Sequence, residues 1–329
     1  MKKTALFKHV GLIGKYLSNA HACTSKPAHD FADVAPCPAA GDVLRGIASC
    51  LQSSGCTVFL EEHSAHGAGL AGQYATRSVA DIASQCDLAV VVGGDGTMLS
   101  AARQLAAARL PLIGINQGRL GFMTDIALEK VQTVLPAMLG GAYREDLRYL
   151  MQAQVVRQGQ VIHEALALND VVLNRGNISG MLELRLEVDG HFVCNQRADG
   201  LIVATATGST AYALSAGGAL MHPSVASWIL VPIAPHTLSN RPIVISENST
   251  ISLKSVAQWQ GASVSFDTQT FDALQHGDSV EVRRATQQAR FLHPLNWNYF
   301  DTLREKLHWN KGASNRGFAT HNPARFCTG

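Results

Sequence analysis

The 329-residue chain is long enough for two domains, and its 47% hydrophobic residues can supply a core for each. Its 27 basic and 25 acidic residues leave a formal charge of +2 without a basic stripe, which disfavours nucleic acid and anionic membrane as partners. Seven cysteines with no Cys-x-x-Cys pair predict reduced thiols in a cytoplasmic protein, not a disulfide framework or a cysteine-rich zinc site.

Neither a secretory signal nor a membrane span is expected. The start Met-Lys-Lys-Thr imitates a signal peptide, but Lys8 and His9 interrupt any apolar region. The stretch 200–240 contains no charged residue, yet it is rich in Gly, Ser, Thr and Pro and lacks a run of about 18 apolar residues. A buried segment facing a ligand explains this stretch better than a bilayer does.

The first 143 residues alternate between apolar runs and helical patterns. Val43, Ile47 and Leu51 lie at helical spacing before Gly55, and a second helix is expected over 128–140 with a possible kink at Pro136. The expected strands are 9–14, 56–60, 87–92 and 110–115. This alternation predicts an α/β domain with a parallel, Rossmann-like sheet covered by helices on both faces, and a long surface loop at 18–41.

From residue 144 the pattern changes to short β runs, which predicts a mostly antiparallel, sandwich-like domain over 144–299. The candidate strands are 152–156, 165–173, 182–188, 191–194, 228–233, 250–253, 262–266 and 279–283. Gln158-Gly159 and Asp189-Gly190 are good hairpin turns. A last helix is expected over 300–311, followed by a disordered tail over 312–329.

The stretch Gly93-Gly94-Asp95-Gly96-Thr97 follows one of the predicted parallel strands. A helix beginning near Thr97 would direct its unpaired N–H groups at an anion over this loop, which favours a phosphate. Asp95 would repel phosphate unless a cation or a transferable proton lay between them, so it indicates magnesium, a catalytic base, or both. The simpler alternative is a turn in which the aspartate caps the helix.

Two other polar groups admit structural explanations. Asn169-Asp170 interrupts an apolar β run, either as a solvated edge or turn, or as a pair whose carboxylate accepts from the two hydroxyls of a ribose. His63 and His66 beside Glu61 and Glu62 could bind a metal, but without further ligands a solvated loop is the better interpretation.

The segment 197–218 reads as a strand, a Thr-Gly-Ser-Thr loop and a helix that begins near Ala211, with Ser209 or Thr210 as its cap. By itself this pattern needs no ligand.

Taken together, these stretches resemble the NAD kinases of the bacterial type. Gly-Gly-Asp-Gly-Thr is shared with diacylglycerol and sphingosine kinases, but Asn-x-Gly-x-Leu-Gly-Phe at 116–122 and the long motif at 197–218 resemble NAD kinases alone. Pro-His-Thr-Leu at 235–238 and Asp-Thr-Gln at 267–269 agree, while Asp170 stands where the family usually has Glu.

The resemblance implies ATP-dependent phosphorylation of the 2′-hydroxyl of the adenosine ribose of NAD, with Asp95 as catalytic base and Mg²⁺ carried by ATP. It implies a last helix that returns to the first domain, and a homodimer or homotetramer. It places Asp199 on the nicotinamide amide and gives no residue as a metal ligand. His236 could be a catalytic base by its residue type, but a structural histidine is the preferred interpretation. The binding residues that the resemblance implies are Gly94, Gly96, Thr97, Asn169, Asp170, Arg197, Asp199, Thr210, Ala211, Tyr212, Ser215, Ala234 and Gln269.

Two other functions are weighed against this one. A lipid kinase would need an apolar substrate groove, and a non-catalytic dinucleotide sensor would keep the fold while losing the reaction.

Overall fold

A computed structural model describes residues 6–15, 40–118, 120–176, 180–256, 259, 261–267 and 269–309. Residues 18–39 of the expected long loop and the whole tail over 312–329 lie outside this range. No helix within it is long and apolar enough to cross a membrane. The cysteines that it describes, Cys50, Cys56, Cys86 and Cys194, are free thiols.

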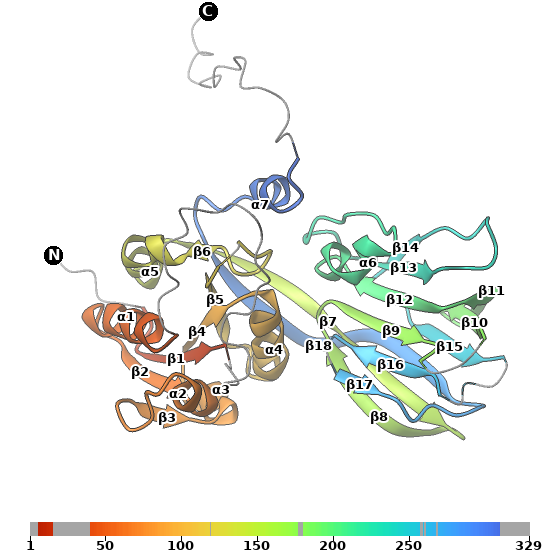
Figure 1. The fold of residues 1–329 in the computed structure, drawn as a ribbon, viewed down its shortest axis with the longest axis horizontal. Helices are drawn as coiled ribbons and strands as arrows, with labels where there is room; N and C mark the ends of the chain where they lie inside the picture. The colour runs from red at the N-terminus through yellow and green to blue at the C-terminus, as the bar shows by residue number, and fades with distance from the viewer. Residues whose placement is uncertain are drawn as a thin grey trace, which may run out of the picture.

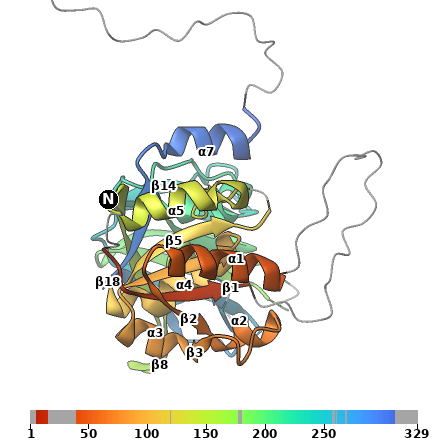
Figure 2. The same ribbon diagram turned by 90° about the vertical axis from the view of Figure 1, so that its left-hand side faces the viewer.

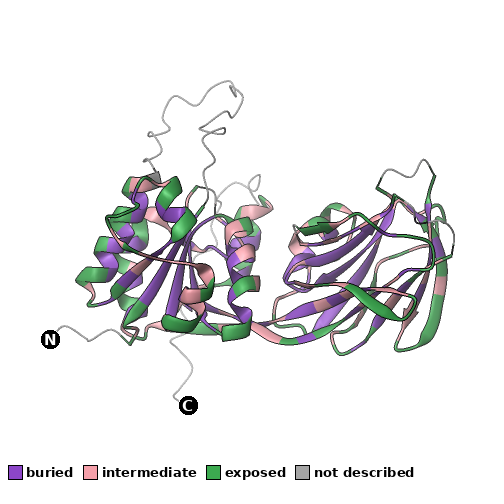
Figure 3. Cartoon of the chain, turned by 90° about the horizontal axis from the view of Figure 1, so that it is seen from below, coloured by how far each residue is buried: buried purple, intermediate pink, exposed green. Residues whose placement is uncertain are grey.

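The first half of the chain is the predicted parallel sheet. Its strands lie in the order β5-β4-β1-β2-β3 (Figure 1). Their bounds are β1 His9–Gly14, β2 Thr57–Glu61, β3 Ala75–Arg77, β4 Leu88–Gly93 and β5 Pro111–Asn116. All residues of β4 and β5 are buried, as a parallel strand covered on both faces requires (Figure 3).

Helices cover both faces of this sheet. The helices α1 (Ala40–Ser53) and α5 (Val131–Leu139) pack on one face, and α3 (Val79–Gln85) and α4 (Asp95–Leu105) on the other. The apolar side chains of the two faces form separate clusters, and alternate residues of β1 and β4 point into each. Smaller elements complete this half, namely α2 (Glu62–Gly67) and β6 (Ile126–Ala127).

The second half is a sandwich of two antiparallel layers. One layer is a six-stranded sheet in the order β14-β13-β12-β9-β16-β17, and the other contains β8-β7-β18-β15-β10-β11. The bounds are β7 Tyr143–Arg157, β8 Gln160–Ala167, β9 Asp170–Asn174, β10 Leu182–Val188, β11 His191–Ala198, β12 Gly200–Thr205, β13 Ser227–Ile233, β14 Ile243–Ser246, β15 Ile251–Ser255, β16 Ser263–Phe266, β17 Gln269–Phe271 and β18 Ser279–Pro294. One apolar cluster joins the facing sides of both layers.

Strand β18 connects the two halves. It runs antiparallel to β7 along most of its length, and Arg290 and Phe291 also pair in parallel with Pro111 and Leu112 of β5. One twelve-stranded sheet therefore continues from the parallel half into the sandwich. The helix α7 (Tyr299–Lys306) follows β18 and returns to the first half, where Lys306 lies 5.7 Å from the ring centre of Phe122 (Figure 2).

Several local expectations are wrong. The run 165–173 is not one strand, because the chain leaves one layer at Ala167 and enters the other at Asp170. The group at 61–66 is not a solvated loop, since Glu61 is 1% exposed and accepts from the Ser64 and His63 N–H groups as the cap of α2.

Two helix starts also differ. The helix after the first glycine motif begins at Asp95, two residues before the expected Thr97. Neither Ser209 nor Thr210 caps the helix α6 (Tyr212–Ser215), because their hydroxyls donate to the carbonyls of Ala206 and Thr207.

Candidate functional site

Asp95 joins the two glycine loops directly. Its Oδ2 accepts from the Phe122 N–H at 2.9 Å and its Oδ1 from the Met123 N–H at 3.0 Å. A Cβ on Gly121 would lie 2.1 Å from Asp95 Oδ1, so only glycine allows this approach. Asp95 is thus the first residue of α4 and the anchor of the loop after β5, and not a cap of its own helix.

A cavity of about 370 Å³ lies at the N-terminus of α4, and a second cavity, of about 380 Å³, lies elsewhere. Gly94, Gly96 and Thr97 line the first of these together with Lys15, which follows β1. No atom lies within 4 Å of the positions that Cβ atoms on Gly94 and Gly96 would take. A helix N-terminus, open glycine backbone and a lysine are what a phosphate requires.

The Asn169-Asp170 pair is held by the carboxylate of Asp267, a residue of the 267–269 motif for which the sequence predicted no role. Asp267 accepts from the N–H groups of Leu168, Asn169 and Asp170 at 2.8 to 3.1 Å. Arg103 of α4 reaches Asp267 Oδ2 at 3.2 Å. Since Arg103 lies eight residues after Asp95, about 12 Å along the helix, α4 links the first glycine loop to this pair.

Asp170 is 6% exposed and has an unusual titration. Burial, and next the negative charge of Asp267, raise its pKa to about 7. Burial also raises the pKa of Asp267, against the lowering effect of its backbone donors and Arg103. The predicted Gln269 begins the neighbouring strand β17 and is exposed.

The loop that follows β12 packs on the same pair. Thr205 Oγ1 donates to the Leu168 carbonyl at 2.6 Å and accepts from the Gly208 N–H. A Cβ on Gly208 would lie 2.0 Å from the Asn169 carbonyl oxygen, so this glycine permits the contact. The predicted residues that come next are Thr210 and Ala211, which are half-buried, and Tyr212 and Ser215, which are exposed on α6.

The other predicted residues lie at the far end of β12. Asp199 pairs with Arg175 at 3.1 Å, Arg197 pairs with Glu183 at 2.9 Å, and Ala234 has a left-handed φ of +43°. The six residues of β12 separate this group from the Thr205–Thr210 loop by about 20 Å. The structure therefore connects Asp95 to Asn169, Asp170 and the Thr205–Thr210 loop through α4 and Asp267, and it leaves Arg197, Asp199 and Ala234 apart from them.

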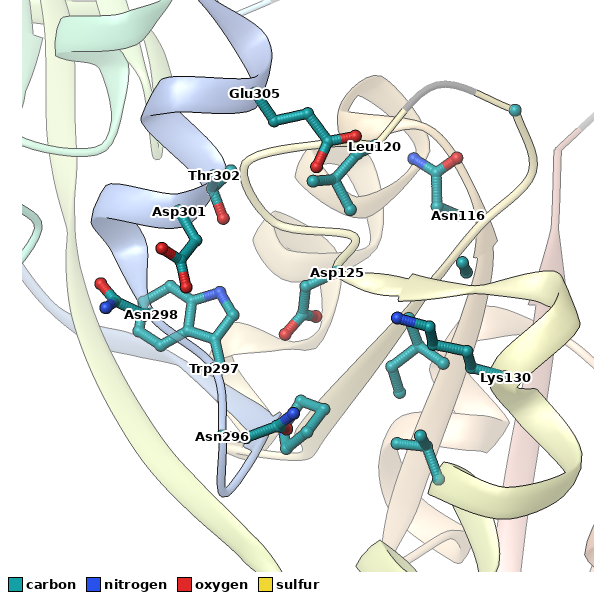
Figure 4. Close-up of a pocket in the computed structure, with 15 residues that line it drawn as sticks. Asn116, Leu120, Asp125, Lys130, Asn296, Trp297, Asn298, Asp301, Thr302 and Glu305 are labelled. Atoms are coloured by element: carbon teal, nitrogen blue, oxygen red, sulfur yellow. The ribbon is translucent and has the colours of Figure 1, made fainter. Parts of the chain in front are cut away.

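The cavity of about 380 Å³ lies on the other side of the second glycine loop, between α5 and the start of α7 (Figure 4). Asn116, Asp125 and Lys130 line it from the first half, and Trp297 and Thr302 from the C-terminal segment. Behind Trp297 lies His293 of β18, which the sequence analysis did not single out. No pattern could have done so, because its partners come from residues far away in the chain.

Two glycine loops that meet at a carboxylate, beside a cavity at a helix N-terminus, define a nucleotide-dependent phosphotransferase on this combination of parallel sheet and β sandwich. The family model described as ATP-NAD kinase N-terminal domain matches residues 41–143, and the ATP-NAD kinase C-terminal domain matches residues 168–294. The chain belongs to the ATP-NAD kinase family.

Curated relatives agree. The NAD kinase of Polaromonas naphthalenivorans (strain CJ2) is 55% identical over 94% of this chain and 99% of its own, and that of Burkholderia multivorans (strain ATCC 17616 / 249) is 48% identical over 96% and 98%. The predicted family is therefore confirmed.

Solved structures support the fold. Yeast NADH kinase complexed with NADH superposes with a TM-score of 0.79 at 22% identity, covering 94% of this chain and 90% of that one. An NAD kinase from Archaeoglobus fulgidus in complex with ATP gives a TM-score of 0.65 at 25% identity, covering 91% and 98%. The predicted pairing of an α/β domain with an antiparallel β domain is confirmed.

Proposed function

We propose that Asp95 is the catalytic residue with which this chain, as an NAD kinase, transfers the γ-phosphoryl group of ATP to the 2′-hydroxyl of the adenosine ribose of NAD, giving NADP and ADP. NAD kinase activity follows from the family and from the curated relatives. The observation that supports the role of Asp95 is its fixed carboxylate at the N-terminus of α4, beside the cavity that contains Lys15.

A ribose hydroxyl is only weakly acidic, but phosphoryl transfer has a loose transition state in which positioning and charge neutralisation supply most of the catalysis. Each oxygen of Asp95 receives one backbone N–H and keeps a further lone pair. Asp95 can therefore orient the hydroxyl without moving and accept its proton late in the transfer.

The nucleotide phosphates would bind over Gly94, Gly96 and Thr97, with Lys15 as their counter-charge. Thr97 uses its N–H for the Gly94 carbonyl at 3.1 Å, so the donors nearest the phosphates come from the residues before it. In the part of the chain that the structure describes, no cluster of three or more acidic, histidine or cysteine residues could hold a metal. As the resemblance to NAD kinases implies, we expect Mg²⁺ to enter as part of the ATP substrate.

The dinucleotide would lie along the sandwich side of the site. Asn169 and Asp170 would bind a ribose. The neighbouring residues that would line the pocket are Thr210, Ala211, Tyr212, Ser215 and Gln269. Arg197, Asp199 and Ala234 would hold the nicotinamide end, and their distance along β12 suits a substrate with two nucleotides. A cytoplasmic homodimer or homotetramer remains the expected state of the molecule.

The alternatives receive less support. The motif at 197–218 lies inside the matched NAD kinase domain, which disfavours a lipid kinase. The fixed carboxylate of Asp95 disfavours a sensor without catalysis, and the assay that follows decides between the kinase and the sensor.

The test is purified protein with ATP, Mg²⁺ and NAD, with product detected by an NADP-specific dehydrogenase. Asp95→Asn keeps the shape of the side chain and should lower kcat by about 10² to 10⁴-fold with little change in the Kd for NAD. Asp42→Asn, on the surface of α1, is the matched control. Normal turnover by Asp95→Asn would refute its role, and NAD binding by a wild type that forms no NADP would support the sensor.

A further inference from the structure

A chain of buried polar side chains crosses from the second glycine loop to the Thr205–Thr210 loop. His293 Nδ1 lies 3.1 Å from Asp125 Oδ2, and its Nε2 lies 3.5 Å from Asp146 Oδ2. Arg148 donates to the same Asp146 oxygen from Nε at 3.0 Å and Nη2 at 2.7 Å. Its Nη1 lies 3.5 Å from Thr207 Oγ1.

Most of these groups are removed from solvent. The side chains of His293 and Arg148 are 1% and 4% exposed and that of Asp125 is 5% exposed, whereas that of Asp146 is 20% exposed. Trp297 stacks on the imidazole at 4.0 Å with an angle of 10° between the rings (Figure 4 shows Trp297 beside Asp125). Two carboxylates face a single guanidinium, so a protonated imidazole balances the charge of the group.

The titration of the imidazole agrees with this balance. Burial opposes the charged form, but Asp125 and Asp146 outweigh it and raise the pKa of His293 above its usual value, although Arg148 acts against them. Burial likewise opposes ionisation of Asp146, but His293 and Arg148 hold its pKa well below the ordinary range.

We propose that His293, with Asp125 and Asp146 on either side of it, is a positioning residue that sets where the Asp95 carboxylate stands. Asp125 lies two residues after Met123, whose N–H binds Asp95. The loop that contains Met123 is closed, because the Gly121 N–H donates to the Thr124 carbonyl at 3.1 Å, and Asp125 follows Thr124 directly. A shift of Asp125 therefore moves the donors that hold Asp95.

The inference rests on the proposed role of Asp95. The Asp95 carboxylate must be fixed by the loop after β5 as well as by α4, and His293 of β18 fixes that loop. A displacement of about 1 Å at a reacting group can cost roughly 10²-fold in rate. The network should thus act on kcat more than on the KM of either substrate.

Two substitutions of His293 separate positioning from mere packing. In His293→Asn the side-chain amide can take the place of Nδ1 and keep the hydrogen bond to Asp125. In His293→Gln the amide takes the place of Nε2, so the hydrogen bond to Asp125 is lost. We expect His293→Gln to lower kcat about tenfold to hundredfold with both KM values within about threefold, and His293→Asn to retain most of the rate. His9→Gln, at an exposed position of β1, is the control.

The pH profile gives a second readout. The wild-type kcat should fall in part as the pH rises through the raised pKa of His293, because a neutral imidazole has one N–H and can give it to Asp146 in place of Asp125. His293→Gln should lack this alkaline fall. If that variant does not fold, Asp125→Ala, which removes the carboxylate that accepts from His293, should show the same loss of kcat.

The outcomes are distinct. An active wild type with an unchanged kcat in both His293→Gln and Asp125→Ala would overturn the positioning role alone. Equal loss in the Asn and Gln variants would also overturn it, since packing and not the Asp125 contact would then matter. A wild type that forms no NADP would instead remove the proposed function, and the positioning role with it.

Discussion

Asp170, the proposed ribose ligand, would couple stability to substrate binding through one buried carboxyl. Its pKa is raised to about 7 by burial and by Asp267, whose side chain is fully buried beneath three backbone donors. The folded protein therefore keeps a proton that the unfolded chain loses near pH 4. The stabilisation from this group is complete below about pH 4 and is lost as the pH rises to about 7.

Binding should follow the opposite course. A ribose hydroxyl needs the ionised form of Asp170 as its acceptor, so the KM for NAD should rise as the pH falls below 7. Asp170→Asn cannot ionise, so its KM should be higher and nearly flat with pH, and its Tm should lose less than the wild-type Tm between pH 5 and 8. Asp272→Asn, exposed after β17, is the control. If the KM for NAD and the Tm changed with pH in the same way in wild type and Asp170→Asn, Asp170 would not be the group that titrates.

At the scale of elements, the proposed role of Asp95 depends on the contact between the loop after β5 and the start of α4. The Phe122 and Met123 N–H groups and the absent side chain of Gly121 make this contact, and the Asn116 side chain supports the loop through Thr124 at 3.1 Å. Neither loop alone fixes Asp95.

Gly121→Ala tests this contact. Its Cβ would fall 2.1 Å from Asp95 Oδ1 and 2.3 Å from Thr124 Oγ1, so the carboxylate must move. We expect kcat to fall about tenfold to hundredfold and the protein to remain folded. Gly46→Ala in α1 is the control, because no neighbouring atom lies within 4 Å of the added Cβ. This variant should keep its activity, and its free energy of unfolding should rise by up to about 1 kcal/mol. Equal activity of the two variants, measured in the same assay, would show that the loop adapts.

The elements also show what sequence can and cannot predict. Strong periodicity and turn glycines were sufficient for β1, α1 and the hairpin at Asp189-Gly190, where φ is +52° and +76°. The short elements β3, α3, β14 and β17 were missed, because pairing and packing stabilise them more than their own pattern does.

The site divides in the same way. Asp95 and Asn169 are adjacent to glycines or strand ends and could be found from local pattern and resemblance. Asp267 and Arg103 are separated by 164 residues, and His293 and Asp125 by 168, so only the folded chain brings each pair together. The largely apolar run 165–173 also hid the change of layer at Leu168, which Asp267 enforces through backbone N–H groups.

At the scale of the whole molecule, the sandwich presents apolar side chains on edge strands. Phe192 and Val193 of β11 are 52% and 40% exposed, and Ile243 and Val244 of β14 are 42% and 52% exposed. Exposed edges with apolar side chains favour pairing with a second copy unless they are covered. This surface supports the expected homodimer or homotetramer.

Light scattering coupled to size-exclusion chromatography tests the assembly. The wild type should elute as a dimer or tetramer at micromolar concentration, and Val244→Lys should shift the population toward smaller species, because a charge on β14 opposes burial. Leu6→Lys, at a 62% exposed site on the other half of the molecule, should leave the mass unchanged. A monomeric wild type would contradict the expectation.

Strand β18 has a consequence for the order in which the molecule can be made. Residues 290–291 complete the pairing of β5, and residues 279–294 complete the pairing of β7, so both wait for the last part of the chain. During synthesis the parallel half must therefore leave the ribosome with an open edge while the whole sandwich is still being translated. A chain that stops before residue 290 lacks the strand that closes that edge, and its nascent first half offers a template for aggregation.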